Sequence, residues 1–499
     1  MKKIIVLVLC IAGLGFIGFR IFEYIQEQNA QTVEIKKPVH HVAAPKPLRV
    51  LDVDALASRM KKHQDLYKQL RDDSLKVYAK LHPNPSQYDK PAQTAIRLAA
   101  YLWVWDDYYK EGLWKTYNDY ACQSTPIHPT ATTPEDSLIN VFSDIWCYSA
   151  RNRHPGNAKA VESLKKCVNN LEKSDYPAHF KYAGYANMVH CLSHIKMCEK
   201  KMDGVTKTNA LIPEMVDKTG YWYGELIRIQ IPDDILYAKG YSLLDDNQDE
   251  EETLTTLWAA LDKKFLNYAP RGAARCALVG GYYTIYAWTA RGSGWSNTVT
   301  DEGWRLMKER LIKAGNLLET AYPDSTLKTI IARKMITVVL GLQQGKELME
   351  TWYRRGIEND PNDYNIYAAK FNFLLPRWYG SPQELLTFGS ECIKTENWAA
   401  KVPMIFISAI SDLAEDNTKI YSMPQVWDPL EKVFREYLNH YPESTIYRSQ
   451  FAKCAAQGGH WKIAKEQFDI LGDEWDRETF SEIEYKSFLE SANRQAKTN

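Results

Sequence analysis

The chain has 499 residues, in which 62 lysines and arginines balance 62 aspartates and glutamates. A formal charge of zero argues against a protein that binds nucleic acid through a basic face. Hydrophobic residues make up 45% and charged residues 25%, which are the values of a globular protein and exclude disorder throughout. The 25 glycines and 22 prolines fall below the average usage of roughly 12%, which favours helices over turn-rich β folds.

The N-terminus carries the pattern of a membrane segment. Lys2 and Lys3 precede an apolar run from Ile4 to Phe19, and after Arg20 the apolar residues continue to Ile25. A helix over residues 4–25 would rise about 33 Å, enough to cross a hydrocarbon core of roughly 30 Å. No A-x-A cleavage site follows closely, so we expect residues 1–25 to form an uncleaved signal anchor. Secretion after signal cleavage is the alternative.

Residues 26–50 are polar and contain three prolines, Pro38, Pro45 and Pro47, without helical or alternating periodicity. This composition predicts a linker that would hold the body roughly 25 to 30 Å from the bilayer. Because the two N-terminal lysines favour the cytoplasmic side of the membrane, we expect the body to face the periplasm or the outside.

The body from residue 51 onward is expected to be all-α, with an N-terminal helical domain over 51–290. The clearest helix begins at Thr300, whose hydroxyl suits an N-cap and is followed by a stripe of apolar and small residues. Ser381-Pro382 and Asp428-Pro429 are similar predicted helix starts, and Thr133-Pro134 is another. The run Leu226–Ile231, which ends at Pro232, is compatible with a short strand or with a helix end.

The residues from 291 to 499 are expected to form tetratricopeptide-like repeats. Between Tyr447 and Leu471 the bulky and small residues, and the turn glycine, have the spacing of a 34-residue tetratricopeptide repeat. They are Phe451, Ala452, Ala455, Gly459, Ala464 and Phe468. Tyr353–Ile357 followed by Asn359–Asp363 indicates another second helix with its proline turn. The expected fold is therefore an α-solenoid of such helical hairpins, in which stacking buries what one repeat cannot.

Three segments in order resemble an uncharacterised bacterial family related to tetratricopeptide proteins, domain-of-unknown-function family 4034. They are residues 290–304, 353–361 and 374–381, and the resemblance covers roughly residues 215–415. It implies a helical repeat-like fold and a bacterial protein, in which the anchor would lie in the cytoplasmic membrane, but it implies no activity. Where the family has Trp-Gly-Gly, this chain has Trp378, Tyr379 and Gly380.

Aromatic residues reach 12% of the chain, and two runs, Tyr101–Tyr109 and Gly281–Trp288, exceed one buried helical face. They indicate either packing between helices or a ligand groove whose rings hold a peptide or stack on a sugar. For a groove, we expect aromatic residues and forked arginine donors to supply the contacts. The candidate binding residues are Tyr283, Trp288, Arg291, Trp295, Arg377 and Trp378.

No cofactor, metal site or catalytic residue is expected. The cluster formed by His190, Cys191, His194 and Cys198 lacks the glutamate of an HExxH motif, and the chain has no CxxC. A helical glycosidase remains an alternative, because Asp106 and Asp107 lie beside the first aromatic run and glycan hydrolysis needs two acids.

The sequence thus favours a membrane-anchored helical-repeat protein that binds or scaffolds a protein or peptide partner. The alternative is a helical envelope protein that binds or hydrolyses glycans. Neither the partner's identity nor the oligomeric state follows from the sequence.

Overall fold

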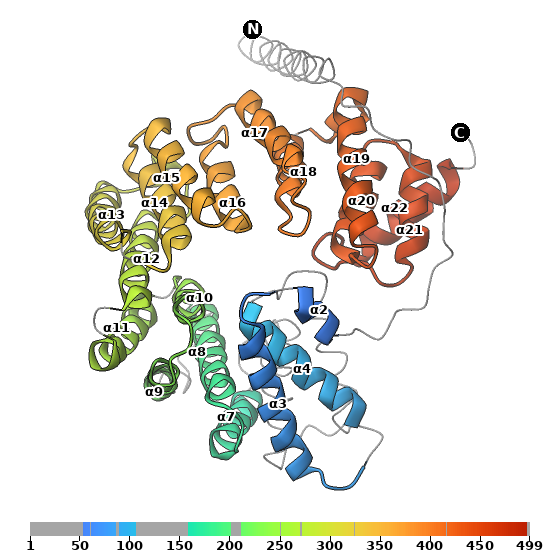
Figure 1. Ribbon diagram of the computed structural model, residues 1–499. Coiled ribbons are helices and arrows are strands. Elements are labelled where there is room, and N and C mark those ends of the chain that lie inside the picture. The colour runs from blue at the N-terminus through green and yellow to red at the C-terminus, as the bar shows by residue number, and fades with distance from the viewer. Residues whose placement is uncertain are drawn as a thin grey trace. The chain divides into compact units, whose positions relative to one another are not determined.

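The computed structural model describes residues 53–59, 61–85, 89–105, 158–200, 211–249, 251–269, 272–323, 325–415 and 417–496. Every secondary-structure element within these ranges is a helix, so the described body is all-α (Figure 1). The expected signal anchor at 1–25 and the linker at 26–50 lie outside the described residues. Among the helices that are described, none is long and apolar enough to span a bilayer.

The described chain divides into two compact units, one up to Leu342 and one from Gln343 onward. The division differs from the expected boundary between residues 290 and 291. The helices on either side of that expected boundary belong together, because the Arg310 guanidinium donates to the backbone oxygen of Tyr286 at 2.6 Å. We call residues 53–342 the N-terminal unit and residues 343–496 the C-terminal unit.

The N-terminal unit is a succession of helices in which neighbours in sequence pack together. α8 contacts α9, α12 contacts α13, and contacts also join next-but-one helices such as α9 with α11 and α10 with α12. The helices are α2 (Val53–Arg59), α3 (Gln64–Leu81), α4 (Asp89–Trp105), α7 (Ala158–Lys173), α8 (Ala178–Lys200), α9 (Ile212–Arg228), α10 (Asp233–Asp245), α11 (Glu251–Tyr268), α12 (Ala273–Arg291), η2 (Ser296–Thr298), α13 (Asp301–Ala321) and α14 (Lys328–Leu342).

The C-terminal unit continues with shorter helices and a core rich in stacked rings, such as Phe434 on Phe451 with centroids 4.9 Å apart. Its helices are α15 (Lys346–Asn359), α16 (Tyr364–Phe373), α17 (Pro382–Lys394), η3 (Val402–Met404), α18 (Ile405–Ala414), η4 (Thr418–Ser422), α19 (Pro424–His440), α20 (Thr445–Gln457), α21 (Trp461–Leu471) and α22 (Glu482–Gln495).

Two of the predicted helix starts are confirmed and one is wrong. The Thr300 hydroxyl accepts from the Gly303 amide and caps α13, and the Ser381 hydroxyl accepts from the Glu384 amide and caps α17. The start expected at Asp428 is wrong, since α19 already begins at Pro424 and contains Pro429 within its length. The pair Thr133-Pro134 lies outside the described residues.

The stretch Leu226–Ile231 is a helix end and not a strand. α9 continues to Arg228, the Ile229 amide still donates to the Glu225 oxygen at 3.0 Å, and Gln230 takes a left-handed conformation with φ 59°. Leu226 and Ile227 are buried side by side whereas Ile229 is 44% exposed, which differs from the alternation of a strand that would bury every second residue.

The hairpin of α20 and α21 has its bulky and small residues at the predicted places. All five predicted packing residues are buried, and Gly459 in the turn between the helices has φ 77°, which favours glycine. Small side chains on both helices let the two backbones approach closely, and the two phenylalanines fill the space beside them. The packing residues are Phe451, Ala452, Ala455, Ala464 and Phe468.

Candidate functional site

The loop between α12 and α13 exposes a tryptophan among residues that the sequence analysis selected. The Trp295 side chain is 77% exposed, whereas Trp288 and Arg291 at the end of α12 are half-buried. The other exposed aromatic residues of the described chain, Tyr221 at 49% and Tyr268 at 50%, are less open, so Trp295 offers the larger apolar face to a partner.

Hydrogen bonds fix the loop on which Trp295 stands. The Arg291 guanidinium donates to the backbone oxygens of Gly292 and Gly294, at 2.9 and 3.0 Å. Beyond the tryptophan, the amide and the hydroxyl of Thr298 both donate to the Trp295 oxygen, at 2.8 and 2.7 Å. The backbone that carries the indole is therefore ordered by side chains before any partner arrives.

The Arg291 guanidinium lies between two further indoles. Its carbon is 5.7 Å from the ring centre of Trp288 and 5.4 Å from that of Trp304 on α13. Cation–π attraction to both rings, together with the two carbonyl contacts, holds the guanidinium in place. Its charge is held against the loop that carries Trp295, so this loop combines an exposed aromatic residue with a fixed cation.

Tyr283 lies about 12 Å before Arg291 along α12, at 1.5 Å per residue. The Lys313 ammonium donates to its hydroxyl at 2.5 Å and lies 4.1 Å from its ring centre. One turn later, the Arg310 guanidinium lies 3.2 Å from the ring centre of Tyr286. These cations cover the ring faces, so Tyr283 serves the packing of α12 on α13 and is separate from the loop with Trp295.

Arg377 and Trp378 belong to the C-terminal unit, so the six candidate residues occupy two units. Arg377 donates to the Asp412 carboxylate at 3.3 Å, which links the end of α16 to α18. The turn itself is tight, because a Cβ at Gly380 would lie 1.7 Å from the backbone oxygen of Leu374. We therefore interpret this motif as a turn that requires glycine.

Asp106 and Asp107, the acids of the glycan alternative, lie outside the described residues. The described part of their aromatic run is packed in the interior, where Tyr101 is 2% and Trp103 is 1% exposed. The Trp105 indole donates to the backbone oxygen of Lys62 at 3.1 Å. The buried rings of Tyr101 and Trp103 contribute to helix packing and offer no face to a sugar, whereas Trp105 is only partly buried.

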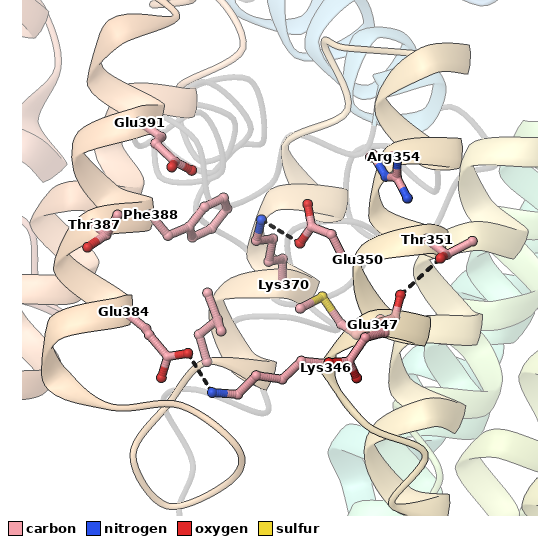
Figure 2. A pocket seen from close by; sticks show the side chains of 12 residues that line it. Lys346, Glu347, Glu350, Thr351, Arg354, Lys370, Glu384, Thr387, Phe388 and Glu391 are labelled. Atoms are coloured by element: carbon pink, nitrogen blue, oxygen red, sulfur yellow. Dashed lines mark hydrogen bonds and ion pairs between the residues drawn. The ribbon is translucent and has the colours of Figure 1, made fainter.

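A pocket that the sequence analysis missed lies in the C-terminal unit, between α15 and α17 (Figure 2). Its volume is about 590 Å³. Polar residues spaced along one face of each helix form its walls, and a lysine and a leucine at the end of α16 lie beneath them. The lining residues are Lys346, Glu347, Met349, Glu350, Thr351, Arg354, Lys370, Leu374, Glu384, Thr387, Phe388 and Glu391.

Two ion pairs cross this pocket from different helices. The Lys346 ammonium lies 2.5 Å from the Glu384 carboxylate, and the Lys370 ammonium lies 2.8 Å from that of Glu350. Partial burial raises the pKa of Glu384, but the hydrogen bonds from Lys346 and Ser381 outweigh it, so the pKa of this carboxyl is lowered. Both carboxylates are thus already engaged at neutral pH.

No model of a known protein family matches the sequence, and no curated protein matches it significantly. Within the described residues, no group of three or more histidine, cysteine, aspartate or glutamate side chains could hold a metal ion. The candidate sites therefore rest on the geometry of the chain itself.

Proposed function

We propose that this protein is a membrane-anchored helical-repeat scaffold that binds a protein partner through the loop carrying Trp295. The single observation that supports it most is the 77% exposed indole on a loop fixed by side-chain hydrogen bonds. Tryptophan and arginine are enriched among the residues that dominate binding energy at protein interfaces. An ordered loop also loses little conformational freedom when a partner binds.

The repeat architecture is part of the same proposal. The α20–α21 hairpin has the small and bulky residues of a tetratricopeptide repeat at buried positions, and contacts between next-but-one helices suit stacked hairpins. Membership of family 4034 and anchoring through residues 1–25 in a bacterial cytoplasmic membrane, with the body outside the cytoplasm, complete the proposal. A glycan-active protein has less support, because Tyr101 and Trp103, two of the three described rings of the run beside the candidate acids, are buried.

The test is quantitative capture of partners by the full chain in mild detergent. Wild type, Trp295→Ala and Ile483→Ala would each be immobilised, mixed with solubilised membranes from the source cells, cross-linked and analysed by mass spectrometry. Ile483 is a matched control, since its side chain is 83% exposed and lies in the other unit. We expect one protein to be recovered stoichiometrically by wild type and by Ile483→Ala.

Trp295→Ala should lose this protein by about thirtyfold or more, because a hot-spot truncation costs roughly 2 kcal/mol or more. Its unfolding midpoint should match that of wild type, since the ring is mostly in solvent. If every recovered protein is captured equally by Trp295→Ala and wild type, the proposed binding surface is wrong.

A further inference from the structure

The pocket between α15 and α17 has a regular construction. α15 contributes Glu347, Glu350, Thr351 and Arg354, and α17 contributes Glu384, Thr387, Phe388 and Glu391, so each wall has the i, i+3, i+4, i+7 spacing of a single helix face. Helix faces that pack directly on each other carry mainly apolar residues at these positions. The polar residues therefore indicate two faces that are built to contact solvent or a ligand (Figure 2).

Some charged side chains of the pocket form ion pairs and others do not. Lys346 and Lys370 are each neutralised by a carboxylate from another helix, as described above. Of the remaining charged side chains, Glu347, Glu391 and Arg354 form no ion pair or side-chain hydrogen bond within the described part of the chain, and all three are exposed. Two free carboxylates against one free guanidinium leave a surplus negative charge for a cationic ligand.

The deeper part of the pocket is apolar and fixed. Met349 and Phe388 are 2% and 3% exposed, and the Phe388 ring meets the Tyr353 ring edge-on at 5.8 Å. The Lys370 ammonium lies 4.3 Å from the Tyr353 ring centre and 4.8 Å from that of Phe388, while its ion pair with Glu350 holds it there. The walls of the pocket therefore stand on an ordered base that is already closed to solvent.

We propose that this pocket binds a short basic segment of a partner protein. A lysine or arginine side chain of the segment pairs with Glu391 or Glu347 at the rim, and the rest of the segment lies along Thr351 and Thr387, which line the pocket and are only partly buried. The volume of about 590 Å³ lies within the roughly 300 to 1,000 Å³ typical of ligand sites. An acidic segment would find only Arg354 as a free cation and would be repelled by the two free carboxylates.

This site goes beyond the proposed scaffold surface, because it lies in the C-terminal unit and uses none of the residues around Trp295. Its test is fluorescence anisotropy of the full chain with a labelled peptide of about eight residues in which arginine alternates with leucine. A matched peptide has glutamate in place of arginine. We expect the basic peptide to bind about tenfold more tightly than the acidic one, and to weaken when salt is raised from about 50 to 300 mM.

Substitutions of charged residues test whether each charge attracts or repels the basic peptide. The double variant Glu347→Gln and Glu391→Gln should weaken binding of the basic peptide by about tenfold, whereas Arg354→Gln should strengthen it by about twofold. Glu358→Gln is the matched control, because Glu358 is exposed on α15 but does not line the pocket. It should leave the affinity unchanged, as should Trp295→Ala.

Equal affinity for the two peptides, or no loss in the double variant, would overturn the proposal. Absence of measurable binding would overturn it as well. Since Trp295→Ala is read out separately in the capture experiment, failure of this site and failure of the proposed scaffold surface can be told apart.

Discussion

His179 is a buried histidine whose ring nitrogens have no hydrogen-bond partner within the described structure. It lies on α8 with 7% of its surface exposed, and its ring meets the Trp103 ring edge-on at 4.4 Å. Burial lowers the pKa of His179 to about 4, from its usual value of 6.5. The unfolded chain therefore takes up a proton at a pH where the folded chain does not.

The sign and size of the effect follow from this difference. Between pH 6.5 and 4 the unfolded state binds more protons, so the free energy of unfolding falls as the pH falls. The loss is absent above pH 6.5, and at about 1.36 kcal/mol per pH unit it reaches about 2 kcal/mol at pH 5. The whole difference is about 3 kcal/mol once the pH is below 4.

The perturbation is His179→Phe, which keeps a ring against Trp103 and removes the titration. Urea unfolding followed by circular dichroism at pH 7.5 and pH 5 gives the loss of stability for each protein. We expect wild type to lose about 2 kcal/mol more than the variant, and His179→Leu to behave like His179→Phe. His190→Gln on the same helix, at a partly exposed position, serves as control. Equal losses in wild type and both His179 variants would refute the reasoning.

Two further substitutions, one in each unit, test a buried lysine and a tight turn. The Lys334 amino group is buried 3.4 Å from the Tyr241 ring centre, and burial lowers its pKa below the usual value of 10.5. Stability of the wild type should therefore rise as the pH rises towards 10, because the unfolded chain binds the extra proton below its own pKa, and Lys334→Met should abolish this gain. Since a methionine has no charge to desolvate, the variant should also be more stable than wild type at pH 7, by about 1 kcal/mol or more. Gly380→Ala should destabilise by about 3 kcal/mol because its Cβ would overlap the Leu374 oxygen, whereas Gly272→Ala, where the added Cβ makes ordinary contacts, should change the thermal midpoint little. An unchanged midpoint in Gly380→Ala, or a less stable Lys334→Met, would contradict these expectations.

The sequence predicts helix caps well in this chain, because they depend on hydrogen bonds between residues that are close in sequence. Thr300 and Ser381 were predictable helix caps because one hydroxyl and one nearby amide decide the interaction. Asp428 failed because the Asp-Pro pair also suits the first turns of a longer helix, in which Pro424 is already in place and Pro429 is tolerated. The start of α19 is set by burial of its apolar face in the core, which no three-residue pattern reveals.

One candidate site could be predicted from the sequence and the other could not. Trp295 could be selected from the sequence because its polar, glycine-containing surroundings are incompatible with a buried helix face. The pocket could not, since Glu347 and Glu391 have the spacing of ordinary solvated helix faces. Only the packing of α15, α16 and α17 makes these faces line one pocket. The cross-helix pair of Lys370 with Glu350 is equally invisible in the sequence, because no local spacing relates the two helices.

The two surfaces should respond differently to ionic strength, and this difference bears on how a scaffold would use them. Binding at Trp295 rests mainly on covering an apolar ring, which salt does not weaken. Binding in the pocket rests on the exposed carboxylates Glu347 and Glu391, whose attraction falls as the Debye length shortens. A partner bound at Trp295 would be retained at high salt, whereas a basic segment bound in the pocket would be released. Salt therefore separates the two contacts in the intact protein without any substitution.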